Sequence, residues 1–334
     1  MGVQGLTQQL KPAMETVGLG RFKGKRVAVD GNVWIHRGTY ACASDISDSD
    51  GYVFYCRKLA RLLLDHGIRP LIVLDGHSLP AKGPERERRR RNRERARHEM
   101  GHHDEQLREL EAQRHGAGER DFELENQLAA ARRMREDAAR RAVAVTMDMI
   151  ERVMLAMQQM DGVQVMRAPY EADAQLAHLA RSGRVDAVLT EDSDLIAYAC
   201  PCVLLKLDRF KAEVQMVTRK ALFEINGRAF SLRGYTPEML LHMCILSGVD
   251  YLDSPKGMGI KTANKWIRKL RDGPQVIRHF KVYAPGGVRV PDGYAEAFGD
   301  ALLTFLHQRV WDEMAEAVVP LTGPLPDGVG AEID

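Results

Sequence analysis

The chain has 334 residues, more than one minimal hydrophobic core requires, so its length favours one large α/β unit with an appended part. Apolar residues make up 45% of the sequence and charged residues 28%, which is typical of a soluble globular protein, and no apolar run approaches the length of a membrane span. The 48 Lys and Arg residues nearly balance the 46 Asp and Glu residues, so the net charge of +2 does not by itself indicate a nucleic-acid partner.

The first residues and the cysteines favour a protein of a reducing compartment without membrane attachment. The opening MGVQGLTQQLK lacks the apolar segment of a signal peptide, and Leu6 stands where the myristoylation pattern requires Ser or Thr. The five cysteines are odd in number and have neither disulfide nor zinc-site spacing, so we expect structural thiols. They are Cys42, Cys56, Cys200, Cys202 and Cys244.

Three segments are typical of buried strands in a parallel sheet, namely residues 26–30 (RVAVD), 70–75 (PLIVLD) and 186–190 (DAVLT). Between the first two, apolar residues at helical spacing from Tyr55 to Leu63 predict a helix. This strand–helix–strand order predicts a right-handed crossover in a doubly wound sheet.

The chain becomes strongly charged between residues 82 and 141. Residues 82–97 hold nine Lys or Arg against three Glu, and residues 113–118 (QRHGAG) interrupt the segment. Few apolar residues anchor it, so we expect two mobile helices inserted into the α/β unit. Such a charge run is usually a solvated, salt-bridged helix, although it is also suited to contact with a nucleic acid.

Apolar order returns with a helix that begins near Val143. Residues 203–207 predict a strand that opens a short hairpin, and residues 237–270 are helical except for an interruption at 247–263. Further helices follow, and the Pro/Gly-rich residues 321–330 are expected to be disordered.

Seven carboxylates are predicted to meet at one edge of the sheet, because the carboxyl ends of parallel strands open onto one crevice. Four of them end or follow the three predicted strands, two lie in the first turn of a helix introduced by Pro169, and one belongs to the motif SGVD. The two acids after the third strand are two residues apart, so an extended chain would point both to one side. The seven are Asp30, Asp75, Glu171, Asp173, Asp192, Asp194 and Asp250.

So many carboxylates close together require cations. Two unit charges about 4 Å apart repel by roughly 4 kcal/mol at an effective dielectric constant near 20. Several such pairs would exceed the roughly 5–15 kcal/mol by which a typical domain is stable. Oxygen ligands without His or Cys select Mg²⁺ or Mn²⁺, and seven acids suit two ions that share a phosphate better than one. Each acid taken singly is more often a cap or turn residue.

The glycine-rich stretch GMGIKT (residues 257–262) is not a P-loop, because Ile260 separates Gly259 from the lysine. Two glycines between helices favour a helix–hairpin–helix turn, whose exposed N–H groups hold a backbone phosphate without reading sequence. A simple corner between two helices is the alternative.

Several segments together resemble the structure-specific 5′-nuclease family of flap endonucleases, and most of all its exonuclease 1 branch. They are MGVQGL, VAVDGNVWIHRG, LIVLDGHSLPAK, APYEADAQLAHL, TEDSDLIAY and CILSGVDYLDSPKGMGIKTA. The resemblance covers residues 1–310. It implies a PIN-like α/β fold with a central, mostly parallel sheet flanked by helices, a helical arch and a helix–two-turn–helix motif.

The resemblance also assigns roles to individual residues. The seven acids would bind metal, and Lys82 and Arg89 match a basic pair that steers and polarises the scissile phosphate. DNA contacts are implied for Gly2, His36, Gly257, Gly259 and Lys261, and potassium contacts for the backbone carbonyls of Ser247, Ser254 and Met258.

On this basis we expect five regions along the chain. Residues 1–97 form an N-terminal nuclease region with the base of a basic arch, and residues 98–141 form the rest of the arch. Residues 142–235 complete the nuclease region, residues 236–310 hold the helix–two-turn–helix and later helices, and residues 311–334 form a C-terminal tail.

The implied activity is 5′→3′ exonuclease and 5′-flap endonuclease action on DNA with 5′ ends, nicks, gaps or flaps. Two Mg²⁺ or Mn²⁺ ions, with K⁺ at the glycine turn, would serve a nuclear monomer of DNA repair, recombination or mismatch repair. The alternatives are a flap endonuclease of replication, a DNA-junction binder without catalysis, and a small phosphatase on an acidic α/β scaffold.

Overall fold

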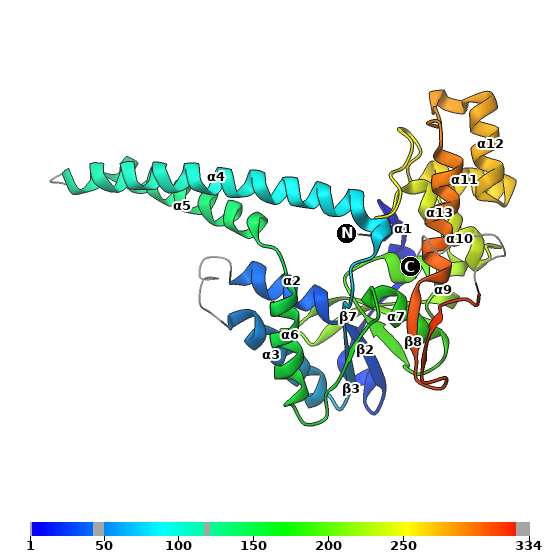
Figure 1. Ribbon diagram of the computed structural model, residues 1–334, viewed down its shortest axis with the longest axis horizontal. Helices are drawn as coiled ribbons and strands as arrows, with labels where there is room; N and C mark the ends of the chain where they lie inside the picture. The colour runs from blue at the N-terminus through cyan, green and yellow to red at the C-terminus, as the bar shows by residue number, and fades with distance from the viewer. Residues whose placement is uncertain (1, 43–49, 117–120, 325–334) are drawn as a thin grey trace. The chain divides into compact units, whose positions relative to one another are not determined.

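The computed structural model describes residues 2–42, 50–116 and 121–324. The chain separates into two compact units (Figure 1). The sheet unit comprises Met1–Val33, Leu59–Gly83 and Met157–Asp334, and the helical unit comprises Trp34–Lys58 and Pro84–Ala156. No helix of the described residues is long and apolar enough to cross a membrane.

A seven-stranded sheet, with strand order β1-β7-β6-β5-β2-β3-β4, forms the centre of the sheet unit. Strands β6, β5, β2, β3 and β4 run parallel, β7 is antiparallel to β6, and β1 is antiparallel to β7. The predicted mostly parallel sheet is therefore confirmed. The strands are β1 (Met14–Gly18), β2 (Arg26–Asp30), β3 (Arg69–Leu74), β4 (Gln164–Arg167), β5 (Ala187–Leu189), β6 (Cys202–Asp208) and β7 (Glu213–Thr218).

The three predicted strands lie side by side at the centre as β5, β2 and β3. From β2 the chain passes to β3 and β4 on one side, and then returns to β5 and β6 on the other, so the order reverses between β2 and β5. A ligand crevice is expected at such a switch point, outside the carboxyl ends of the strands. Two strands, β1 and β4, were not predicted, because β1 is a largely exposed edge strand and β4 has only four residues, two of them exposed and two partly buried.

The helices of the sheet unit follow the predicted order. The 237–270 segment is two helices with a break between them, and the predicted hairpin is β6–β7. The helices are α1 (Leu6–Gln9), α7 (Ala172–Arg181), α8 (Asp194–Ala197), α9 (Arg219–Glu224), α10 (Pro237–Ser247), α11 (Ile260–Leu270), α12 (Gly273–Tyr283) and α13 (Tyr294–His307). Single 3₁₀ turns span Lys11–Ala13, Leu19–Phe22, Pro80–Lys82 and Pro285–Gly287.

A second hairpin, β8 (Arg309–Asp312) with β9 (Ala317–Pro320), ends the described chain and was not predicted. Its register pairs Val310 with Val319. Of the Pro/Gly-rich stretch expected to be disordered, residues 325–330 lie outside the described residues.

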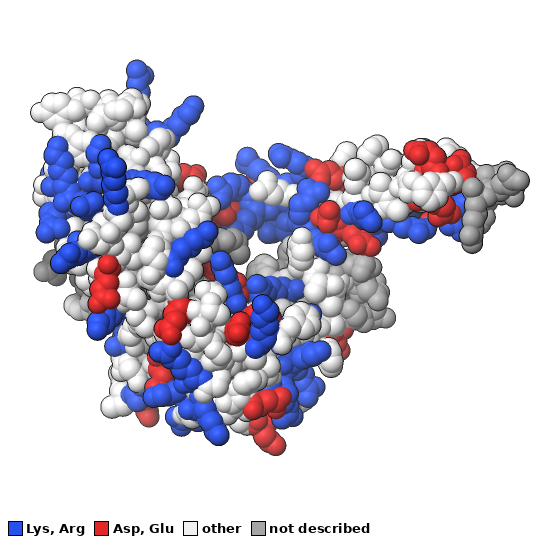
Figure 2. Space-filling model, turned by 180° about the vertical axis from the view of Figure 1, so that it is seen from behind, with Lys and Arg blue, Asp and Glu red and all other residues white. Residues whose placement is uncertain are grey.

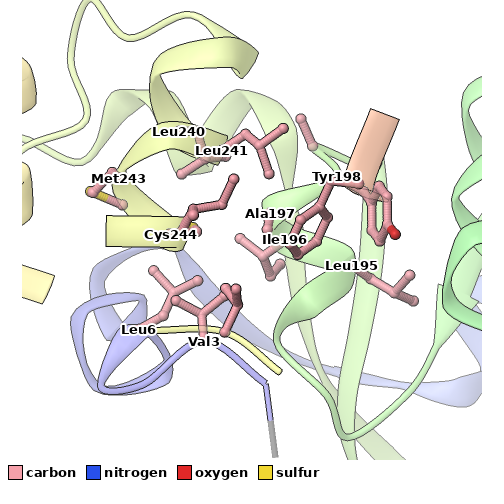
Figure 3. Packing of buried hydrophobic residues seen from close by; sticks show 14 of the residues in the cluster. Val3, Leu6, Leu195, Ile196, Ala197, Tyr198, Leu240, Leu241, Met243 and Cys244 are labelled. Atoms are coloured by element: carbon pink, nitrogen blue, oxygen red, sulfur yellow. The ribbon is translucent and has the colours of Figure 1, made fainter. Parts of the chain in front are cut away.

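The core of the sheet unit reaches to the start of the chain. Val3 and Leu6, which are 3% and 0% exposed, belong to one buried cluster with Ile196 of α8 and with Met243 and Cys244 of α10. Figure 3 shows these side chains turned toward one another. Burial of apolar surface therefore anchors Val3 and Leu6, and this fixes the backbone of Gly2 just before them.

The helical unit contains two long antiparallel helices, α4 (Gly83–Gly116) and α5 (Phe122–Ala142). A small apolar cluster around Leu110 and Leu128 joins them, together with ion pairs such as Arg135–Asp104 at 3.0 Å. The predicted pair of charged helices is confirmed; the interruption predicted between them lies partly outside the described residues, which omit 117–120. The remaining helices, α2 (Gly31–Ala41), α3 (Gly51–Asp65) and α6 (Met147–Gln158), begin or end in the sheet unit.

Candidate active site

Asp30, the last residue of β2, lies at the switch point and is 5% exposed. Its Oδ1 accepts a hydrogen bond from the Val33 amide at 3.2 Å, and its Oδ2 accepts one from the Thr190 hydroxyl at 3.0 Å. The bonds tie Asp30 to the start of α2 and to the end of the neighbouring β5, so its orientation is fixed.

The next strand and helix bring three more acids to the same edge. Asp75 follows β3, and its Oδ1 accepts the Ala172 amide of α7 at 2.8 Å. Glu171 is the N-cap residue of α7, and Asp173 lies in its first turn. The prediction placed both acids in the first turn; Glu171 instead keeps an extended backbone, and its side chain caps no amide of the helix.

Asp192 and Asp194 lie in the turn that follows β5. The strand ends at Leu189, and Asp194 begins the short helix α8. Asp192 Oδ1 accepts the Asp194 amide at 3.2 Å, while the Asp192 amide donates to the Thr190 hydroxyl at 3.0 Å. The argument from an extended chain does not apply to these two acids, because the chain has already turned after β5. The turn nevertheless keeps both acids at the same edge of the sheet.

Gly2 approaches the same turn from the start of the chain. It has a φ of +91°, and a Cβ built on it would lie 1.8 Å from Asp192 Oδ1. No side chain fits in that space, so the site requires glycine there. The structure thus brings Gly2 to the acids, whereas its implied contact with DNA stays a prediction.

The acids lie close enough to act on one another electrostatically. Burial raises the pKa of Asp30 to about 7, and the nearby Asp75 and Asp192 carboxylates act in the same direction. Burial and the surrounding carboxylates also raise the pKa of Asp173 and of Asp194 well above the usual value. Like charges in a poorly solvated place disfavour ionisation, so the site destabilises the fold unless a cation is present.

Asp30→Asn should therefore stabilise the metal-free protein at pH 8. Because folding raises the pKa of Asp30 from 3.8 to about 7, its contribution to stability is complete below pH ~4 and is lost as the pH rises through 7. Three pKa units correspond to about 4 kcal/mol, of which we expect the variant to regain roughly 1–3 kcal/mol, since Asn accepts fewer hydrogen bonds. Urea unfolding in EDTA at pH 8 and pH 5 measures this.

The gain should shrink at pH 5, where Asp30 of the wild type is protonated. Asp161→Asn, at an exposed turn residue, serves as the control and should change the free energy of unfolding little at either pH. An Asp30→Asn protein that is less stable than the wild type at pH 8 would contradict the electrostatic account.

Lys82, at the end of a 3₁₀ turn, is the cation that the sheet unit itself supplies. Its Nζ lies 2.6 Å from Glu171 Oε1 and 3.4 Å from Asp250 Oδ2, and all three side chains are at most 16% exposed. It also lies 5.4 Å from the centre of the Tyr251 ring. Burial opposes its charge, but Glu171, Asp173 and Asp250 outweigh that effect and raise its pKa. Lys82 therefore stays protonated and partly neutralises the acids.

The donor set fits divalent cations. Asp173 Oδ1 and Asp194 Oδ1 are buried and find no hydrogen-bond partner within the described part of the chain, and every candidate ligand is a carboxylate. No group of three or more Asp, Glu, His or Cys side chains among residues 2–42, 50–116 and 121–324 is arranged to hold an ion as it stands. Mg²⁺ retains several waters and binds through one or two carboxylates, so it does not need a closed ligand set.

Two predicted site residues belong to the helical unit. Arg89 lies on α4, and its Nε donates to Glu85 Oε1 at 2.7 Å; His36 is exposed on α2. The predicted contacts of Arg89 with the scissile phosphate and of His36 with DNA stay predictions.

The glycine turn connects α10 to α11. Gly257 has a φ of +92°, Gly259 is the N-cap residue of α11, and Lys261 is exposed in its first turn. Ser247 ends α10, and Met258 is buried, with its amide donating to the Pro255 carbonyl at 2.8 Å. The two predicted helices and the glycine turn between them are present. The potassium contacts of Ser247, Ser254 and Met258 stay predictions.

Three residues around the acids were missed by sequence reasoning. Thr190 bridges Asp30 and the Asp192 amide, Tyr251 donates to Glu171 Oε2, and Gln308 donates to the same oxygen at 3.3 Å. Thr190 and Tyr251 adjoin predicted acids within recognised motifs, so position alone could have suggested them. Nothing in the sequence around Gln308 indicates a site.

Two family models match the chain, the XPG N-terminal domain over residues 1–96 and the XPG I-region over residues 162–250. The first match contains Asp30, Asp75 and Lys82, and the second contains the other five acids. The chain belongs to the XPG family. In this XPG-family chain, both matched regions therefore contribute to one carboxylate site, while Gln308 and α11 lie outside them.

Curated relatives agree with this membership. The chain is 36% identical to exonuclease 1 of Oryza sativa subsp. japonica over 100% of its length and 37% of that protein, and 38% identical to exonuclease 1 of Xenopus laevis over 96% of its length and 41% of that protein. Exodeoxyribonuclease 1 of Schizosaccharomyces pombe is 32% identical, over 97% of this chain and 52% of the relative. The chain thus spans 37–52% of the length of these relatives.

Solved structures share the fold. The catalytic core of Rad2 in complex with DNA substrate matches with a TM-score of 0.57 and 20% identity, covering 90% of this chain and 84% of that chain. The Holliday junction-resolving enzyme GEN1, in complex with product DNA and Mg²⁺, matches with a TM-score of 0.57 and 18% identity, covering 94% and 67%. At these identities the likeness concerns the fold.

Proposed function

We propose that this protein hydrolyses phosphodiester bonds of DNA near 5′ ends, as a 5′→3′ exonuclease with 5′-flap endonuclease activity. One observation carries the proposal. Seven carboxylates from both family regions converge at the switch point of the sheet, and two of their buried oxygens lack any partner among the described residues. A fold of marginal stability would not retain such a cluster without a use for it.

The seven acids would hold two Mg²⁺ or Mn²⁺ ions. When bound, such ions lower the pKa of water and stabilise the charge of the attacking and leaving oxygens. Glu171 and Asp173 come from the start of α7, whereas Asp192 and Asp194 come from the turn after β5. Each pair would therefore contribute ligands mainly to one of the two ions. Thr190 and the Ala172 amide hold Asp30 and Asp75 in place for this.

Lys82 would then change partners. Cations bound by the acids weaken its attraction to Glu171 and Asp250, and its ammonium group becomes available to a phosphate oxygen. Lys82 thus binds and polarises the scissile phosphate, with Arg89 proposed as its partner.

The duplex beyond the cut would lie on α11 and α12. Between Ile260 and Tyr283 the chain carries seven Lys or Arg and one Asp, and six of the basic side chains are exposed on these helices (Figure 2, upper left). Lys265 and Lys269 lie over the Trp266 ring at 5.8 and 5.0 Å. Backbone phosphates suit such a surface, and K⁺ at the glycine turn would assist.

The first half of α4 supplies a second basic surface. Residues 83–97 contain eight Arg and three Glu, whereas residues 98–116 contain two Arg and five acids. We infer that the basic half contacts the 5′ strand, with His36 packing near the cut. A nuclear monomer in DNA repair is the setting that this activity favours.

Digestion of 5′-labelled substrates tests the function. A blunt duplex, a nicked duplex and a 5′ flap are incubated with Mg²⁺ or with EDTA, and product lengths are resolved. We expect Mg²⁺-dependent products from all three. Cleavage of the flap alone would favour a flap endonuclease of replication, and tight binding of all three without any cleavage would favour a junction-binding protein.

A further inference from the structure

Gln308 connects the end of the described chain to the carboxylate site. It lies between α13 and β8, outside both regions that match the family models, and is 2% exposed. Its Nε2 lies 3.3 Å from Glu171 Oε2, 2.8 Å from the Tyr251 hydroxyl and 3.5 Å from the Tyr198 hydroxyl. A buried amide therefore directs its donors at one acid and at the tyrosine that holds the same acid.

The orientation of this amide is determined by its surroundings. Its Oε1 is buried and finds no hydrogen-bond partner in the described residues, which costs free energy. The reversed orientation would give Oε1 no better surroundings, because it would face the Glu171 carboxylate and repel it. In this orientation the N–H groups of Gln308 donate to Glu171 and Tyr251, while its Oε1 makes no hydrogen bond to the described residues. The contacts of the side chain thus favour orientation of Glu171 over complete hydrogen bonding of the amide.

The β8–β9 hairpin is also fastened to the helix that carries the acids. Gln175 of α7 donates from Nε2 to the Trp311 carbonyl at 2.9 Å, and its Oε1 accepts the Trp311 amide at 2.7 Å. Gln175 is 0% exposed and lies one helical turn beyond Glu171. One turn further on, His178 lies 3.5 Å from Asp312 of β8. The hairpin is therefore fastened to α7. Gln308, the residue just before the hairpin, also contacts the side chain of Glu171, which is the N-cap residue of α7.

The two oxygens of Glu171 have partners of different kinds. Oε1 faces the Lys82 ammonium at 2.6 Å, whereas Oε2 receives hydrogen bonds from the neutral Gln308 and Tyr251. Neutral donors orient a carboxylate without neutralising it, so they leave its charge for a cation at the other oxygen. Lysine, in contrast, competes with that cation. Partners of this neutral kind tune metal affinity by about 10–100-fold in metalloenzymes.

We propose that the β8–β9 hairpin is a positioning element of the carboxylate site and that Gln308 is the residue through which it orients Glu171 toward a divalent cation. This rests on the proposed function. It extends the working site to residues 308–312, beyond both matched family regions.

Gln308→Met tests the proposal, because Met keeps the length of the side chain and removes the donors. Mn²⁺ binding to the DNA-free protein is measured by calorimetry, and kcat, KM for a 5′-flap substrate and the melting temperature are measured beside it. We expect Mn²⁺ affinity and kcat to fall by about 10–100-fold while KM changes less than threefold. Gln175→Met, which loosens the hairpin without touching Glu171, should shift the same two quantities by a smaller factor.

Gln215→Met is the matched control, since Gln215 donates to Thr16 on the edge of the sheet and contacts no acid of the site. The proposal is overturned if both Gln308→Met and Gln175→Met bind Mn²⁺ and turn over within twofold of this control. It is also overturned if their losses appear only in the melting temperature. A wild-type protein that neither binds Mn²⁺ nor cleaves DNA would refute the proposed function itself, and this assignment with it.

Discussion

Asp173→Ala should abolish DNA cleavage while leaving DNA affinity largely unchanged. Burial first, and then Asp30, Asp192 and Asp194, raise the pKa of Asp173, so its ionised form is costly unless a cation is bound beside it. Its Oδ1 is buried without a partner among the described residues, which leaves that oxygen for a metal ion. We expect single-turnover cleavage to fall by on the order of 10³-fold or more, or at least ~4 kcal/mol of transition-state stabilisation.

DNA affinity depends on other residues, so it serves as the internal control. The basic surface of α11 and α12 is unchanged in this variant, and fluorescence anisotropy with a labelled flap in Ca²⁺ should give a dissociation constant within threefold of the wild type. Asp161→Ala, at an exposed carboxylate, should cleave normally. Near-normal turnover by Asp173→Ala would refute the metal-dependent mechanism.

Lys82→Met should destabilise the metal-free protein more than the metal-bound protein. Lys82 and its two carboxylate partners are at most 16% exposed, so removing the ammonium takes a cation away from two poorly solvated carboxylates, Glu171 and Asp250. Breaking a buried ion pair costs about 3–5 kcal/mol. Mg²⁺ neutralises the same acids, so we expect it to restore at least half of the loss in unfolding free energy. Cleavage should also fall by about 10²-fold, through loss of the phosphate contact.

Lys25→Met is the matched control. Lys25 pairs with Asp186 at 2.9 Å, but both side chains are exposed, at 54% and 38%, so its loss should cost less than about 1 kcal/mol. The control should respond to Mg²⁺ as the wild type does. Equal destabilisation of Lys82→Met in EDTA and in Mg²⁺ would show that Lys82 and the cation do not act on the same carboxylates.

The edge of the sheet where the acids meet could be predicted from sequence, because it follows from strand order alone. Once three buried segments are recognised as parallel strands, the residues that end or follow them must share one crevice. The local geometry could not be predicted in the same way. Whether Asp192 and Asp194 follow an extended chain or a turn depends on β5 ending at Leu189, and short central strands carry little periodicity.

The contribution of Gln308 and the β8–β9 hairpin could not be predicted, because it arises from contacts between residues more than 130 positions apart. A single Gln followed by RVWD has no pattern that distinguishes it from any other surface hairpin. The ion pairs of Lys82 were hidden for a related reason. The sequence resemblance predicts that Lys82 contacts the scissile phosphate, whereas in the DNA-free structure its ammonium group forms ion pairs with Glu171 and Asp250.

The crowded carboxylates also bear on how this protein could be engineered. A screen for heat-resistant variants performed in a chelator would favour loss of the acids that the proposed cleavage requires, since each one removed relieves repulsion. Thermal tolerance and catalytic competence would then be selected in opposite directions. If Mg²⁺ is present throughout such a screen, selection favours variants that keep the acids, because only a protein that still binds the ion is stabilised by it.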